Sequence, residues 1–412
     1  MPLSADLVRL AFVPEDAYGV TPANPEFQVM RVTGESVNFA PTTTNSNEMN
    51  PNRGVTDLIL TGGSVSGDIP FELAYEHWLN LFLAMAMCNT WEADSIQVGK
   101  TLLSATLEKY LPVDPGTTEL YHRVPGTIVD GFSLNIAPNA VITGTFSVLG
   151  KSMDPDEAPL VGATCIDPAY NPVMAAPTVT DITLAGVVAT TECFSNMVVN
   201  LANNNRAVEC IGFLGAKEMV LGRAEVSLNF SLYFSDNDLL QMLLDQEAIA
   251  ISFKLVDTAE PANWYEFEFP RVKLSQANAD ATGTGADVVY EAVGQALLDP
   301  VTGTQMIITR SPEPFVPAVT TIDGAVVTNN AAADGVAINT VRFTARDQNG
   351  DPMQGVPLTF SVDKGTALPA PVSANTAADG TATVNVTDTA AEVVNVTATY
   401  NLVQKSQAVS FV

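Results

Sequence analysis

The sequence predicts a mainly β protein: two related β-sandwich or barrel domains, each with one short α-helix, followed by a C-terminal β-sandwich. From Ala318 to Val412 the sequence consists of short alternating runs rich in Val and Thr, as expected for half-buried strands. Two strand-to-helix segments coincide at a constant offset of 161 positions. A proline-rich stretch then separates the C-terminal part from the rest, and 412 residues exceed the length over which one hydrophobic core usually grows.

The first half contains a strand at 65–73 that runs into a helical segment at 74–88. Apolar residues at helical spacing in that segment predict a helix packed on a sheet, with Trp78 and Phe82 in the core. A β-rich block that begins near Pro125 and a closing strand at 142–148 follow.

The second half repeats this order of elements. A strand at 226–234 precedes a helix at 239–244, in which Leu239 and Leu243 take the places of Trp78 and Phe82. A block that begins near Pro270 and a closing strand at 287–293 complete it. Because identities are few, chance similarity between two β-rich segments stays open as the alternative.

These segments divide the chain into domains. We expect a first domain with an N-terminal arm at 1–154, a linker or arm at 155–177, a second domain at 178–310, a proline-rich linker at 311–317 and a β-sandwich at 318–412.

The C-terminal sandwich carries two specific turns, one at 347–352 that leads into Leu358-Thr359-Phe360 and one at 376–382. Together they resemble the bacterial Ig-like repeats of invasin and intimin type. The acid-rich turn lacks the later bidentate Glu of a calcium-binding EF-hand, so we expect a turn that supplies its own hydrogen bonds.

Composition excludes one class of function. The net charge of −28 disfavours binding of DNA or RNA through phosphate contacts, which needs Lys and Arg. The sandwich from Ala318 onward has eight acidic and four basic residues, so −24 belongs to the preceding residues. Such acidity serves solubility, and it also suits a surface that nucleic acid passes without sticking.

No secretory signal or membrane-spanning run is expected. Met1 to Arg9 lacks a basic start followed by an apolar run, so synthesis in the cytoplasm follows. The longest apolar run, Trp78 to Cys88, is too short to cross a bilayer.

No catalytic, cofactor or metal site is expected either. The four cysteines are scattered without zinc-site spacing, so free buried thiols are the default, with a bridge between Cys193 and Cys210 left open. His77 and His122 lack further histidine partners, and a helix-start or surface role is favoured. The stretch around Val65 lacks the nucleophile of a hydrolase elbow.

From roughly Leu10 to Thr309 the sequence resembles the major tail tube proteins of long, non-contractile-tailed bacteriophages. The residues that carry this resemblance are Phe12 to Gly19, Gly62 to Leu83 and Gly131 to Ile136. The resemblance implies a structural virion protein that stacks as rings into the tail tube, the conduit for DNA ejection. It also implies a homotrimer with pseudo-sixfold symmetry, favoured over a hexamer, and three protein partners: the tail terminator, distal tail and tape-measure proteins.

Ring stacking is expected to use a polar excursion at Pro41 to Gly54 and the terminal arm at Met1 to Gly19. The candidate stacking residues are Thr42, Asn45, Asn47, Glu48, Asn50 and Arg53, together with Glu15 and Tyr18. Genomic DNA would pass through an acidic lumen without specific binding, and the Ig-like domain would project outward, where it shields the tube or weakly touches host surface glycans.

The alternative is a capsid decoration protein or an adhesin-type binding module in which the Ig-like domain is the functional part. The missing secretion signal counts against an adhesin, and the long duplicated segment counts against simple decoration. An enzyme is a distant third possibility.

Overall fold

The computed structural model describes residues 3–114, 118–185, 187–188, 193–233, 236–257, 259–280, 283–285, 287–312, 319–347, 350–401 and 403–412. Met1 and Pro2 of the expected arm, residues 313–317 of the expected linker, and Gln348 and Asn349 of the acid-rich turn lie outside the described residues. The chain divides into two compact units, Met1–Glu313 and Pro314–Val412, which are described separately. The predicted fold class is confirmed: strands dominate both units, and the described part of the first unit holds two α-helices.

The elements of the first unit are the 3-10 helices η1 (Ala5–Leu7) and η2 (Ala176–Thr178), the helices α1 (His77–Met87) and α2 (Asp238–Leu244), and the strands β1 (Arg9–Pro14), β2 (Glu26–Val29), β3 (Asn38–Asn45), β4 (Leu58–Glu72), β5 (Ser95–Gln97), β6 (Ala105–Asp114), β7 (Thr118–Ile136), β8 (Thr143–Gly150), β9 (Asp154–Asp156), β10 (Thr164–Ile166), β11 (Val179–Leu184), β12 (Val187–Val188), β13 (Phe194–Ala202), β14 (Arg206–Glu209), β15 (Ala216–Val220), β16 (Glu225–Tyr233), β17 (Ala248–Val256), β18 (Trp264–Asp280), β19 (Val289–Ala296) and β20 (Ile307–Arg310).

Strand β7 organises the first half, because it changes partners along its length. Its first part pairs with β6 and β9, and its second part pairs with β8. Pro125 lies inside this one long strand, at a register shift against β6 between Val124 and Thr127, whereas the sequence predicted a block that begins near this residue. Proline has no N–H for the ladder, so it is tolerated where the pairing changes.

The second half repeats this scheme in β18, which pairs first with β17 and β20 and then with β19. Pro270 stands at the corresponding register shift, between Phe269 and Val272 against β17. Each long strand then carries a single-residue bulge, at Asp130 against β8 and at Ser275 against β19. A shared pairing order with a bulge at the same point shows that the two β folds are duplicates.

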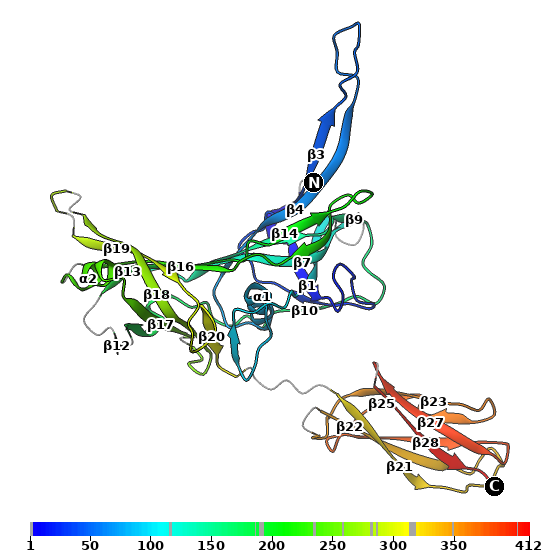
Figure 1. Cartoon of the computed structure of the whole chain (residues 1–412). Coiled ribbons are helices and arrows are strands. Elements are labelled where there is room, and N and C mark those ends of the chain that lie inside the picture. Colours follow the sequence, from blue (N-terminus) through cyan, green and yellow to red (C-terminus); the bar gives the residue numbers. More distant parts are fainter. Residues whose placement is uncertain are drawn as a thin grey trace. The chain divides into compact units, whose positions relative to one another are not determined.

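The two halves are joined by strand pairing. Residues 131–136 of β7 pair antiparallel with residues 197–202 of β13, so that β3, β4, β8 and β7 continue into β13, β16, β19 and β18 (Figure 1). We call this eight-stranded sheet the continuous sheet. The first 313 residues therefore form one compact unit rather than two separate ones, and the division at 154 and 178 stays a prediction.

Helix α1 packs on the apolar face of the continuous sheet. Trp78 and Phe82 are buried, and the Phe82 ring lies 5.2 Å from that of Phe146 on β8. The expected helix at 74–88 starts three residues late, because Ala74 forms a β-bridge with Val173 and Glu76 has extended backbone. In α2, Leu239 is buried and Leu243 is partly buried against the same cluster.

The expected N-terminal arm is wrong from Arg9 onward. Residues 9–14 form β1, which pairs with β2 and β6, and Leu10 and Phe12 lie in the core. A short run of consecutive apolar residues is typical of a strand that is buried on both faces.

Residues 155–177, expected to be a linker or arm, pack against the first half. Strand β10 pairs parallel with β2, and Met174 is fully buried. The buried Glu76 carboxylate fixes this segment, since it accepts hydrogen bonds from Arg31 Nη1 at 2.8 Å and from the backbone N–H groups of Ala169 and Asn171 at 2.9 Å each.

The second unit is a sandwich of two four-stranded sheets. Its strands are β21 (Thr321–Thr328), β22 (Asn339–Arg346), β23 (Pro357–Val362), β24 (Leu368–Ala370), β25 (Ser373–Asn375), β26 (Thr381–Thr387), β27 (Val393–Tyr400) and β28 (Val403–Ser410). The ring of Phe343 stacks on that of Phe360 between the sheets at 5.8 Å. In the acid-rich turn, Asp347 Oδ1 accepts a hydrogen bond from the backbone N–H of Asp351 at 2.8 Å, which is the self-supplied bond expected from the sequence.

Candidate functional site

The hairpin formed by β3 and β4 extends beyond the body of the first unit (Figure 1). The excursion expected at 41–54 is partly strand, because residues 41–45 continue β3 and only residues 46–57 form the tip. The candidate stacking residues Thr42, Asn45, Asn47, Glu48 and Arg53 are exposed on this hairpin and Asn50 is half-buried.

The same hairpin also exposes apolar residues, which were not predicted from the sequence. Leu58 and Leu60 are 62% and 48% exposed, and Ile59 on the opposite face of β4 is 47% exposed. A strand that exposes apolar side chains on both faces has no core to cover within its own subunit. The consecutive run Leu58-Ile59-Leu60 was the signal that could have identified it.

Glu15 and Tyr18 do not lie on an arm. The Glu15 carboxylate accepts hydrogen bonds from Gly19 N, Ser104 Oγ, Thr106 Oγ1 and Gly126 N at 2.7 to 2.9 Å. Burial, with the neighbouring carboxylates of Glu15 and Glu218, raises the pKa of Tyr18 to about 12. Glu15 therefore connects loops of its own subunit, and the Tyr18 ring packs against the buried cluster of Ile128, Ala216 and Met219. The hairpin remains the candidate for stacking.

The continuous sheet has two unlike faces. One face is apolar and buried, with Phe132, Leu134 and Val199 among its residues. Directly opposed residues share a face, and one row across the other face runs Asp68, Ser147, Gly131, Ala202, Glu225. We call this second face the polar sheet face.

Small polar and acidic side chains make up most of the polar sheet face. Its acidic residues, all exposed, are Asp68, Glu72, Glu225, Asp280 and Glu291. The strand segments that form it contain no Lys or Arg: 64–72, 131–136, 143–150, 196–202, 225–233, 276–280 and 289–296. Strand β18 continues this face before its bulge, where Lys273 lies opposite Gln295. The face therefore presents negative potential with few groups that could hold a phosphate.

The continuous sheet ends in two open edges. Within the described residues, β3 pairs only with β4, and residues 276–280 of β18 pair only with β19. The β3 edge is capped by its own subunit: Val37 N–H donates to Glu35 Oε2 at 3.0 Å, and Lys109 Nζ donates to the Val37 carbonyl at 3.3 Å. Lys109 and Glu35 also form an ion pair at 2.6 Å. Charged side chains of this kind protect an edge strand from pairing indiscriminately.

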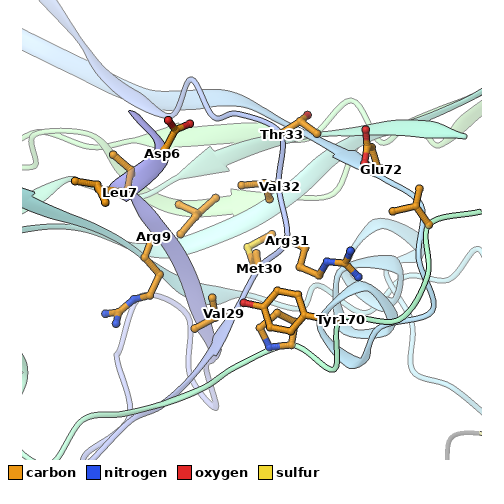
Figure 2. A pocket seen from close by; sticks show the side chains of 14 residues that line it. Asp6, Leu7, Arg9, Val29, Met30, Arg31, Val32, Thr33, Glu72 and Tyr170 are labelled. Atoms are coloured by element: carbon orange, nitrogen blue, oxygen red, sulfur yellow. The ribbon is translucent and has the colours of Figure 1, made fainter. Parts of the chain in front are cut away.

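An open cavity of about 450 Å³ lies beside β1 and residues 29–33, and Figure 2 shows the side chains that line it. Its two guanidinium groups are engaged within the chain. Arg31 pairs with Glu76 and lies over the Tyr170 ring at 5.4 Å, and Arg9 lies over the Tyr110 ring at 4.7 Å. The cavity wall is thus held by internal contacts.

The described residues hold no group of three His, Cys, Asp or Glu side chains that could bind a metal ion. All four cysteines are free, so the bridge between Cys193 and Cys210 is not formed, and Cys165 and Cys193 are exposed rather than buried. Of the helices in the described part of the chain, none has the length and apolar character to cross a bilayer.

Comparisons with known proteins match both units. The phage tail tube protein family matches residues 5–296, and the bacterial Ig-like domain (group 1) matches residues 321–412. No curated protein matches the chain.

Solved structures with similarity include the D00-D0 domain of intimin, at 21% identity and a TM-score of 0.22, covering 40% of this chain and 93% of that one. The D0-D1 domain of intimin has 12% identity and a TM-score of 0.21, covering 45% and 89%. A glycosyl hydrolase family 2 member from Bacteroides cellulosilyticus has 12% identity and a TM-score of 0.21, covering 40% and 23%.

Proposed function

Because this chain belongs to the phage tail tube protein family, and is therefore a structural component of the virion tail, we propose that it polymerises as stacked rings that form the conduit for DNA ejection. The observation that carries this proposal is the continuous sheet, with one buried apolar face, one polar acidic face and an open edge at each end. Joining open edges in a ring leaves no unpaired strand.

The size of the sheet favours three copies per ring. Each chain contributes eight strands, so three copies give 24. At a spacing of about 4.8 Å, 24 strands have a circumference of about 115 Å and a backbone diameter of about 37 Å before strand tilt widens it. Side chains of about 5 Å on each wall leave roughly 27 Å, wider than a DNA duplex. Six copies would double the diameter and enclose the duplex loosely.

In this ring the polar sheet face lines the channel. Its five carboxylates outnumber the amine of Lys273, so the face repels phosphate and the genome slides without specific binding. At physiological salt the repulsion acts over about 8 Å, which keeps it close to the wall.

Stacking is assigned to the hairpin of β3 and β4, with its polar residues at 42–53 and its exposed apolar residues at 58–60. The tail terminator, distal tail and tape-measure proteins would meet the tube at its ends and within its channel. The Ig-like unit would face outward, where it shields the tube or contacts host surface glycans weakly, and assembly would take place in the host cytoplasm.

Electron microscopy of the purified full-length protein tests the proposal. We expect hollow tubes or rings, with three copies around the axis and the polar sheet face on the channel wall in a cryo-EM reconstruction. Isolated globules under all assembly conditions would contradict the ring. A channel lined by neutral or basic side chains would overturn only the electrostatic part.

A further inference from the structure

The internal duplication specifies how two copies meet. Inside one chain, the second half adds β13 to the edge of β7, and Ser133 lies opposite Asn200. β18 is the duplicate of β7, and its corresponding edge is open in the described residues. β3 is the duplicate of β13, and its corresponding edge is open as well. The joint inside the chain is therefore a template for the joint between chains.

The register follows from two anchor points. The first anchor point lies on β3 and β13. Ser66 of β4 pairs with Asn38, and its counterpart Ser227 of β16 pairs with Asn200. Asn38 therefore corresponds to Asn200. The second anchor point lies on β7 and β18, where the residue that follows the bulge is Gly131 in β7 and Gln276 in β18. Counting two residues onward from each of these makes Ser133 correspond to Asn278.

We propose that β18 of one copy pairs antiparallel with β3 of the next copy, with Asn278 opposite Asn38, in the register of the internal joint. This inference rests on the proposed ring and specifies its contact. Ala277 then lies opposite Phe39 and Ala279 opposite Val37 on the apolar face.

The faces agree with this register. In the internal joint Phe132 and Leu134 lie on the buried face, and Ser133 lies on the polar one. In the proposed joint, the buried Val37 and the half-buried Phe39 alternate with the exposed Asn38. A slip by one residue would bring apolar side chains to the polar sheet face.

Helix α2 gives an independent indication of a missing neighbour. Leu79 and Leu83 of α1 are 0% and 1% exposed, whereas Leu240 and Leu244, 161 positions later, are 38% and 68% exposed. The second half contributes to the surroundings of α1, since Tyr265 Oη donates to Asn80 Oδ1 at 2.8 Å. In the proposed joint, the first half of the next copy would lie beside α2 and cover Leu240 and Leu244, as the second half lies beside α1 within one chain.

The joint between copies differs from the internal one in two respects. The internal joint is locked by Asn203 N–H, which donates to the Asp130 carbonyl at 2.7 Å, but the counterpart of Asn203 is Pro41, which has no N–H. In addition, the Val37 groups that would pair with Ala279 are held by Glu35 and Lys109 in the free subunit. The joint between copies therefore has fewer bonds than the internal one and has to displace this cap.

Cysteine cross-linking tests the register. Ser36 N–H points to β4, where it donates to the Asp68 carbonyl. Because backbone directions alternate along a strand, Val37 N–H then points to the open edge and Asn38 N–H points back to β4. Asn38 would therefore form a non-hydrogen-bonded pair with the strand of the next copy, and side chains lie closest together in such pairs. In a background with Cys165, Cys193 and Cys210 changed to Ser, tubes of the Asn38→Cys, Asn278→Cys variant should form reducible disulfides between chains. On a non-reducing gel the ladder should end at three chains.

Two matched variants control the geometry. Ser133→Cys with Asn200→Cys, the internal counterpart, should form a disulfide within one chain and run as a monomer. Asn38→Cys with Gln276→Cys, displaced by two residues, should cross-link far less because its Cβ atoms are diagonal neighbours.

Hydrogen exchange of the wild-type protein gives a second reading that does not depend on a variant. Amides at 37, 39, 277 and 279 should exchange more slowly in tubes than in free subunits. Hollow tubes without this protection, or with stronger cross-linking in the displaced pair, would overturn the register and leave the ring intact. Failure of the wild-type protein to form rings would instead remove the proposed function on which the register rests.

Discussion

At the scale of single residues, the Glu76 carboxylate connects three parts of the first half. It lies just before α1, pairs with Arg31 at 2.8 Å and receives two backbone N–H groups from residues 169–171. Because the carboxylate is buried, its loss would leave a cation and two amide donors without their acceptor.

We therefore expect Glu76→Ala to lower the free energy of unfolding of the first unit by about 3 kcal/mol. Tryptophan fluorescence during urea unfolding measures this specifically, since Trp78, Trp91 and Trp264 all lie in the first unit. The exposed Glu72→Ala is the matched control and should change stability by less than about 0.5 kcal/mol. An equal effect of both variants would show that the carboxylate network does not stabilise the unit.

At the scale of elements, the hairpin of β3 and β4 combines an exposed polar tip with an exposed apolar stem. Leu58 and Leu60 are already exposed, so Leu58→Ser with Leu60→Ser should leave subunit stability within about 0.5 kcal/mol of the wild type. Loss of apolar contact between rings should shorten the tubes or leave single rings, as measured by negative-stain microscopy. Val336→Ser, at an exposed apolar residue of the Ig-like unit, should leave tube length unchanged. Tubes of normal length in the double variant would exclude the stem from stacking.

Element order could be predicted from the sequence, whereas element partners could not. The 161-residue offset identified both helices and the strands before them, and Val65 and Val226 occupy equivalent positions on β4 and β16. The joint of β7 with β13 joins strands about 65 positions apart through backbone bonds, which leave no side-chain signature. The single-residue bulges at Asp130 and Ser275 are likewise set by the pairing partner rather than by the residue.

The candidate site was predictable to a similar degree. Net charge indicated an acidic surface, but the alternation that places Asp68 and Glu291 on one face became visible only with the pairing order. The prediction of a terminal arm was wrong because the consecutive apolar residues of β1 form a strand buried on both faces. The half-buried Glu15 consequently makes its hydrogen bonds within its own subunit.

At the scale of the whole molecule, the two units have separate cores and no core residue in common. Deletion of Ala318 to Val412 should therefore leave tubes of unchanged diameter that lack outer density. Electron microscopy measures the diameter, and tryptophan fluorescence checks that the first unit keeps its fold. Failure of the truncated protein to polymerise would assign the Ig-like unit a part in assembly.

The Glu35 and Lys109 cap on β3 bears on when assembly begins. A newly made subunit satisfies the Val37 backbone groups with its own side chains, so it gains little from an encounter with another free subunit in solution. A partner offsets the loss of the ion pair between Glu35 and Lys109 only if it offers both a complete matching strand and a surface that covers α2. We therefore expect free subunits to assemble slowly on their own and much faster on a preformed end, which would limit the number of unwanted tubes in a crowded cell.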